Sequence, residues 1–259
     1  MAHRLKVLAA VVALIVAGGC GLTGRDNSDK PVAVAAPPSA EPTFDLVTES
    51  PSAEPTTSAP APPAKKPKSA EPTQPAFWSQ LPECAHYDKT KAVSKSKVKA
   101  ALKAASGRVY WRTEAPQLKL NYPLVKAVAW QESGWQSNIH NCDGGAGVMQ
   151  VMPNTVDMIN GRFGLTYDAS RYQDNADAGA NYLAWMTKWV GDRYFGGSYN
   201  LSAAKCKTHS SWCLLNVVIS GYNAGQGGIE AAASGKELPN PEYVAAVRSL
   251  MTRCQCDKY

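Results

Sequence analysis

A single glutamate at the end of an apolar segment is the first candidate for chemistry in this chain of 259 residues. Residues 122–133 predict a helix, because Asn121 is a good N-cap, Pro123 falls in the first turn and the residues that follow are nearly all apolar. A helix that apolar is expected to be buried, and Glu132 lies at its end. Burial and the negative end of the helix dipole both disfavour an ionised carboxylate. The position therefore predicts a general acid, which donates a proton to a departing oxygen.

A glycine-rich stretch follows this helix. Residues 144–150 read GGAGVMQ, and such glycines let the backbone approach a ligand closely. Taken alone, a glutamate at a helix end is more often an ordinary core-helix terminus than a catalytic acid. Further motifs along the chain favour the catalytic interpretation.

Four motifs, in order, resemble the catalytic core of the lysozyme-like lytic transglycosylases, the family of the soluble lytic transglycosylase. They are Glu132-Ser133, the loop GGAGVMQVMP at 144–153, the segment GYNAG at 221–225 and Tyr243-Val244. Between the second and third, residues 174–183 (DNADAGANYL) resemble a helix of that family. No one motif is specific, but their order over roughly half of the chain is.

The resemblance implies a reaction as well as a fold. In that family one glutamate protonates the leaving oxygen and then, as a base, takes a proton from the muramoyl C6 hydroxyl, which closes a 1,6-anhydro ring. It implies that Glu132 fills both roles on the MurNAc-GlcNAc β-1,4 bond of peptidoglycan, with no cofactor. The positions it implies for substrate binding are Gln150, Asn223, Tyr222, Tyr243, Met149 and Asn141.

Three positions leave alternatives open. Many members of the family have Ser where this chain has Asn141, and the usual Ala of the glycine turn is Gly145 here. Asp143 lies in the same loop, where a second carboxylate would help to position water. A hydrolytic muramidase related to goose-type lysozymes is therefore one alternative, although we favour Asp143 as a cap of its own turn. A non-catalytic wall-binding lipoprotein is the other.

The N-terminal residues predict export. Residues 1–19 hold Arg4 and Lys6 and then an apolar run too short to span a bilayer, which is typical of a secretory signal peptide. The small residues before Cys20 resemble a bacterial lipobox, which implies cleavage and lipidation there, although Ala17 departs from the usual Leu or Val. We expect an extracytoplasmic protein with a lipid anchor at Cys20, on the outer face of the cell membrane. A plain signal peptide is the alternative.

The segment at 20–76 predicts a disordered linker behind that cysteine. Its residues 21–76 hold 12 of the 18 prolines and one aromatic residue, Phe44, so they cannot bury enough apolar surface to offset the entropy of ordering. The catalytic domain is expected at 77–259. The helices expected there are at 91–105, 107–115, 122–133, 153–160, 174–190, 213–220, 226–234 and 241–251. The fold class is thus mainly α, and the resemblance implies a lysozyme-like domain with a saccharide groove.

The cysteines support the same compartment. Apart from Cys20, six remain, which outside the cytoplasm suggests up to three disulfides: Cys84, Cys142, Cys206, Cys213, Cys254 and Cys256. Cys206 and Cys213 can close a short loop. Cys254 and Cys256 are too near for an easy mutual bond, so we expect them to reach back to Cys84 and Cys142. No Cys-x2-Cys spacing occurs and the histidines are scattered, so no metal site is predicted.

The net charge of +6 resides in the expected catalytic domain, because residues 1–76 carry equal numbers of basic and acidic groups. Six lysines crowd its first predicted helix: Lys89, Lys91, Lys95, Lys97, Lys99 and Lys103. We interpret them as a solvated helix face, the alternative being attraction to an anionic wall or membrane surface. The expected compartment excludes nucleic acid as a partner.

Overall fold

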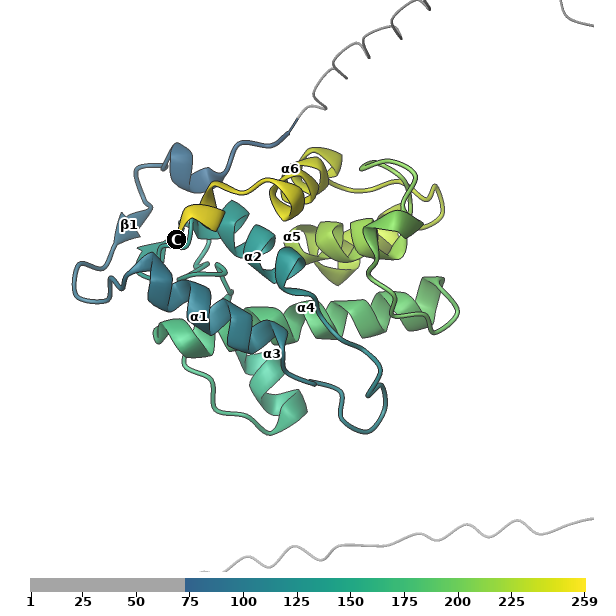
Figure 1. Cartoon of the computed structure of the whole chain (residues 1–259), viewed down its shortest axis with the longest axis horizontal. Helices are drawn as coiled ribbons and strands as arrows, with labels where there is room; N and C mark the ends of the chain where they lie inside the picture. The colour runs from purple at the N-terminus through teal and green to yellow at the C-terminus, as the bar shows by residue number, and fades with distance from the viewer. Residues whose placement is uncertain (1–72) are drawn as a thin grey trace, which may run out of the picture. The chain divides into compact units, whose positions relative to one another are not determined.

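Six α-helices carry the part of the chain that the computed structural model describes, residues 73–259 (Figure 1). They are α1 (Lys95–Ser106), α2 (Tyr122–Ser133), α3 (Pro153–Phe163), α4 (Tyr172–Tyr194), α5 (Leu214–Ala232) and α6 (Pro241–Thr252). Short 3-10 helices lie at η1 (Phe77–Ser79), η2 (Ala203–Lys205) and η3 (Gln255–Lys258). The predicted mainly α class is confirmed. The predictions for the signal peptide, Cys20 and nearly all of the linker fall outside the described residues.

Five of the helices close a ring around the core. α2 packs against α1 and α6, α4 packs against α1 and α5, and α5 packs against α6 (Figure 1). α3 packs on α4 from outside this ring. One hydrophobic cluster, with residues from α1, α2, α4, α5 and α6, fills the interior. No described helix is long and apolar enough to cross a membrane.

α2 has the start and the end that its sequence predicts. The Asn121 side chain accepts a hydrogen bond from the Leu124 backbone N–H at 2.9 Å, as an N-cap does. The helix ends at Gly134, whose φ is +60°. A Cβ at that position would lie 2.8 Å from the Trp78 ring, so a side chain fits neither the backbone conformation nor the space. Gly134 therefore fixes where α2 stops, two residues after Glu132.

A two-stranded antiparallel sheet holds the chain that enters the domain against the loop that follows α2. β1 (His86–Tyr87) pairs with β2 (Ile139–His140), and the rings of His86 and His140 stack with their centroids 5.0 Å apart. This pairing brings Cys84 and Cys142 together, and they form a disulfide.

The disulfide map corrects one prediction. Cys206 and Cys213 are bonded as expected. Cys254 and Cys256, which were expected to reach back to Cys84 and Cys142, are instead bonded to each other. The reason is that β1 and β2 have already paired Cys84 with Cys142, and both C-terminal cysteines are buried at the start of η3.

The predicted helix at 107–115 is wrong. Gly107 ends α1, and the chain from there to Asn121 forms turns in which Trp111, Ala115 and Leu118 are buried one at a time. The two helices predicted at 213–220 and 226–234 form one element, α5, which Gly225 interrupts with φ +72° and ψ 175°.

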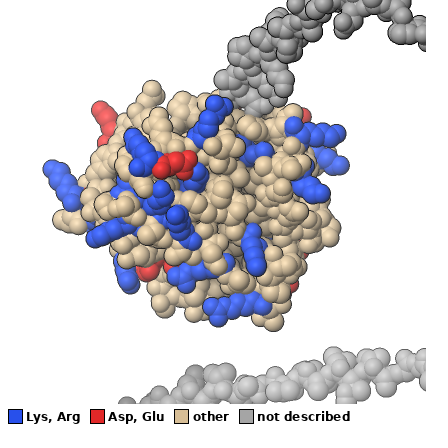
Figure 2. Space-filling view, in the orientation of Figure 1, with Lys and Arg blue, Asp and Glu red and all other residues tan. Residues whose placement is uncertain are grey.

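The lysines of α1 are less free than a solvated face would be. The Lys95 ammonium donates a hydrogen bond to the Gly134 carbonyl at 2.8 Å and lies 4.6 Å from the centroid of the Trp130 ring. Lys99 donates to the Tyr259 carbonyl at 2.9 Å. Figure 2 shows that Lys and Arg side chains nevertheless spread over the face that α1 presents, with few acidic residues among them.

Candidate active site

Glu132 lines a pocket of about 220 Å³ at the C-terminal end of α2. The walls come from α2, the loop after it, α5, α6 and the chain that enters the domain. Six predicted site residues meet there: Glu132, Asn141, Gln150, Tyr222, Asn223 and Tyr243. Positions up to 111 residues apart in sequence are thus brought to one site.

The environment of Glu132 raises the pKa of its carboxyl group, so that a large fraction of it is protonated at neutral pH. Its side chain is only partly exposed, and burial raises its pKa to about 7. The Tyr243 hydroxyl donates a hydrogen bond to Glu132 Oε1, which favours the charged form and opposes this shift. The charge of Asp143 adds to it. Such a carboxyl group can both give and take a proton near pH 7.

The hydroxyl groups of the two tyrosines of the site donate hydrogen bonds to different acceptors. Tyr243 is 2% exposed, and burial together with the neighbouring Glu132 raises its pKa well above the ordinary value, so it stays a neutral donor. Tyr222 donates its hydroxyl proton to the Met149 carbonyl at 2.8 Å. Tyr243 therefore contacts the carboxyl group itself, whereas Tyr222 ties α5 to the glycine loop.

The glycine loop is anchored from two helices. From α2, the Ser133 hydroxyl donates to the Val148 carbonyl at 2.6 Å. From α4, Asn175 accepts from the Met149 N–H at 2.9 Å and donates to the Ala146 carbonyl at 2.8 Å. Gly147 lies against the Asn175 amide so closely that a Cβ would come within 2.6 Å of it. The loop is therefore held in one conformation before any ligand binds.

Three of the predicted substrate-binding residues differ in which side-chain atoms they leave available to bind a ligand. Gln150 has φ +48°, and its amide nitrogen donates to the Ile139 and Gly147 carbonyls at 3.2 and 2.9 Å. Its Oε1 is buried and has no hydrogen-bond partner among residues 73–259. Asn223 is exposed, and its Oδ1 accepts from Asn240 at 2.6 Å. Met149 is fully buried and is not among the residues that line the pocket.

The two polar residues of the loop before the glycines mainly hold their own turns. Asn141 Oδ1 accepts from the Cys142 N–H at 2.7 Å, and Asp143 Oδ1 accepts from the Gly145 N–H at 3.0 Å. Asp143 thus caps its turn, as favoured above, and it also lines the pocket.

Sequence reasoning missed part of the wall. Gln74, Phe77, Gln131 and Met152 also line the pocket. Gln131 donates its amide proton to the Gln74 carbonyl at 3.1 Å, which lays the entering chain across the end of α2. The only available signal was position, since Gln131 precedes Glu132 and Met152 follows the glycine loop. Nothing in the sequence indicated that the chain just before η1 returns to this site.

Residues 109–240, about half of the chain, match the family model described as the transglycosylase SLT domain. The chain belongs to this family. The family predicted from the four motifs is therefore confirmed. A curated relative is the membrane-bound lytic murein transglycosylase F of Pseudomonas fluorescens, which is 26% identical over 146 residues. Those residues are 56% of this chain and 26% of the relative, so the match spans about a quarter of the relative's length.

Proposed function

We propose that this SLT-family chain is a lytic transglycosylase that cleaves the MurNAc-GlcNAc β-1,4 bond of peptidoglycan and leaves a 1,6-anhydro-MurNAc end. The observation that carries the proposal is the carboxyl group of Glu132, which has a pKa of about 7 and lines a pocket of this family's domain. A group with that pKa exchanges its proton readily at neutral pH.

Glu132 acts twice in the proposed reaction. As an acid it protonates the glycosidic oxygen, so the bond to the departing sugar breaks. As a base it then takes the proton of the C6 hydroxyl, whose oxygen closes the anhydro ring, so no water is consumed. The Tyr243 hydrogen bond orients the carboxyl group and stabilises its charged form between the two steps.

The pocket supplies groups suited to an N-acetylated sugar. The unpartnered Gln150 Oε1 accepts a hydrogen bond from a sugar hydroxyl or an N-acetyl N–H. Asn223 uses its Oδ1 on Asn240, which leaves its amide protons to bind a sugar oxygen. Asn141 lines the same pocket and is the weaker of the polar contacts, because its Oδ1 already caps a turn.

A hydrolytic muramidase is the second candidate, and Asp143 is the observation that favours it. Its carboxylate lines the pocket and raises the pKa of Glu132. A second carboxylate in a glycosidase positions or activates water. The transglycosylase is preferred because Asp143 Oδ1 is already engaged by the Gly145 N–H.

The test of the catalytic assignment is Glu132→Gln, which keeps the shape and the bond from Tyr243 but removes the proton donor. We expect release of soluble fragments from purified peptidoglycan to fall by roughly 10²-fold or more. Asp157→Asn, an exposed acid outside the pocket, is the matched control and should leave release unchanged. If Glu132→Gln and the wild type release fragments equally, another residue is the acid. If neither releases fragments but both bind the wall, the chain is a wall-binding protein.

We also propose that the enzyme works outside the cytoplasm, bound to the membrane through a lipid at Cys20. The support is the lipobox-like sequence together with the membrane-bound relative. Metabolic labelling with a fatty-acid probe tests it: the wild type should be labelled and Cys20→Ser should not.

A further inference from the structure

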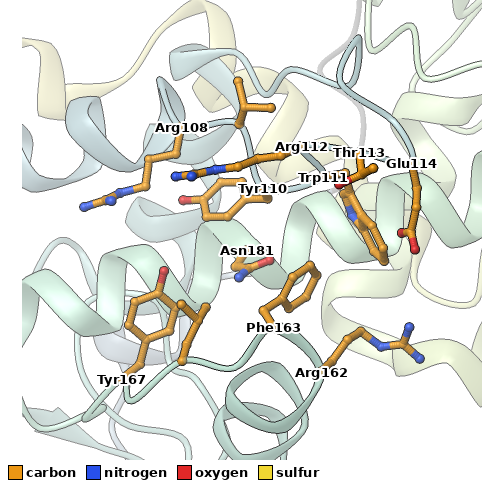
Figure 3. A pocket seen from close by; sticks show the side chains of 12 residues that line it. Arg108, Tyr110, Trp111, Arg112, Thr113, Glu114, Arg162, Phe163, Tyr167 and Asn181 are labelled. Atoms are coloured by element: carbon orange, nitrogen blue, oxygen red, sulfur yellow. The ribbon is translucent and has the colours of Figure 1, made fainter.

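A second and larger pocket shares no lining residue with the candidate active site. Its volume is about 970 Å³. It lies between residues 108–114, which follow α1, and residues 162–167, at the end of α3, with α4 beneath (Figure 3). Residues 108–114 come before α2 in the chain, whereas Glu132 lies in the last turn of that helix. The two pockets therefore take their walls from different segments of the chain.

Two residues of the lining each carry a buried polar atom that has no hydrogen-bond partner among residues 73–259. Asn181, from α4, is 1% exposed, and its Oδ1 accepts no hydrogen bond among the described residues. Trp111 is 8% exposed, and its Nε1–H has no acceptor in the same part of the chain. Figure 3 shows the Asn181 amide on α4 in the middle of the view, with the rings of Tyr110, Phe163 and Tyr167 around it. An unpaired buried polar group is unfavourable, so a ligand that pairs with both atoms gains by binding.

The rim carries an excess of positive charge. Arg108 is held by Asp177, with its Nε 2.7 Å from Oδ1. Arg112 and Arg162 are exposed and make no ion pair with any residue from 73 to 259. Glu114 is the one carboxylate of the lining. Two free guanidinium groups thus stand at the edge of an aromatic pocket.

We propose that this pocket binds a short acidic peptide. A peptide amide offers an N–H to Asn181 Oδ1 and a carbonyl oxygen to Trp111 Nε1–H, which pairs both orphaned atoms. Arg112 and Arg162 match the fork geometry of a carboxylate, and the rings pack against the apolar parts of the peptide. A neutral glycan has amides in its N-acetyl groups but nothing for the guanidinium groups, so it fits the pocket less well.

The peptide stem of peptidoglycan, which carries carboxylates, is the acidic peptide that we assign to the pocket. That choice rests on the proposed function, whereas the chemistry of the pocket does not. The chain would then hold its substrate at two places, by the glycan at Glu132 and by a peptide at Trp111 and Asn181.

Binding of a stem tripeptide, L-Ala-γ-D-Glu-meso-diaminopimelate, to the full chain tests the proposal. The readout is the indole N–H signal of Trp111 in a ¹H–¹⁵N spectrum, assigned by its loss in Trp111→Phe. We expect the tripeptide to shift this signal saturably at millimolar concentration, and chitotetraose, a neutral N-acetylated glycan, to leave it in place.

Charge variants at the rim decide whether the guanidinium groups recognise the peptide. The exposed Arg112→Gln/Arg162→Gln double variant should weaken tripeptide binding by about tenfold or more. Lys119→Gln, an exposed cation outside the pocket, should bind as the wild type does. The proposal is overturned if the tripeptide causes no shift, if chitotetraose shifts the signal equally, or if the double variant binds normally.

The tripeptide has no glycosidic bond, so its binding does not depend on cleavage. A chain that cleaves peptidoglycan but does not bind the tripeptide contradicts this proposal alone. A chain that binds the tripeptide and cleaves nothing supports the pocket and contradicts the proposed function.

Discussion

Glu132 is surrounded by groups that act on its pKa in opposite directions. Burial raises the pKa to about 7, the hydrogen bond from Tyr243 lowers it, and the charge of Asp143 raises it. The acid step needs the protonated form, so the rate should fall as the pH rises through this pKa. The position of that falling limb is therefore a direct readout of the environment of the carboxyl group.

Two substitutions should move the falling limb of kcat/KM in opposite directions. Tyr243→Phe removes the hydrogen bond that favours the carboxylate, so the pKa of Glu132 and the limb move to higher pH. Asp143→Asn removes a neighbouring negative charge, so both move to lower pH. The measurement is the pH profile on a soluble peptidoglycan fragment, with Asp157→Asn as the charge control. This account of the site is contradicted if neither substitution moves the falling limb of kcat/KM, or if both move it in the same direction.

At the scale of elements, the site depends on the hydrogen bonds by which α2 and α4 anchor the glycine loop. Ser133 holds it from α2 and Asn175 holds it from α4. Tyr222 adds a contact from α5 through the Met149 carbonyl. Because three helices share one loop, loss of a single contact should loosen the pocket without unfolding the domain.

Asn175→Ala should destabilise the chain and reduce its activity together. It leaves the Met149 N–H without a partner and removes one of the two donors of the Ala146 carbonyl, which keeps the Val151 N–H, at a cost of about 2 kcal/mol. Urea unfolding measures the loss, and hydrogen exchange at residues 148–150 should accelerate. Asn200→Ala, which removes one exposed hydrogen bond to the Ser202 N–H far from the glycine loop in sequence, is the control and should leave loop exchange and activity unchanged. Wild-type exchange in Asn175→Ala would show that the loop does not need this anchor.

The elements with strong local signals were predictable, and the others were not. α2 has a cap, an N-terminal Pro and a closing glycine, and its predicted range agrees with the structure. The apolar residues of the segment at 107–115 suggested a helix, but they do not form one. Trp111 and Ala115 are buried from an irregular segment with turns. The wall contributed by Gln74 and Phe77 was hidden for a different reason, since only tertiary packing brings that segment to α2.

At the scale of the whole molecule, the Cys84–Cys142 disulfide ties the entering chain to the loop of the site. It spans 58 residues, whereas Cys206–Cys213 spans 7. Residue types alone could not reveal this pairing, because it follows from β1 lying against β2. The sequence could show only that the number of cysteines suits disulfides.

Removing the long-range disulfide should therefore cost more than removing the local one. From loop entropy, Cys84→Ala/Cys142→Ala should lose about 2 kcal/mol more unfolding free energy than Cys206→Ala/Cys213→Ala. Denaturant titration of both double variants measures the difference. Because Asn141 and Asp143 flank Cys142, the first variant should also lose activity while the second keeps it. Equal losses in the two variants would indicate that the entering chain is held mainly by packing.

The products released from the glycan are the most direct test of what Glu132 does. The measurement is mass spectrometry of the fragments that the full chain releases from purified peptidoglycan. We predict fragments that end in 1,6-anhydro-MurNAc from the wild type and none from Glu132→Gln. Fragments with reducing ends, one water heavier, would contradict the transglycosylase and assign the activation of water to Asp143.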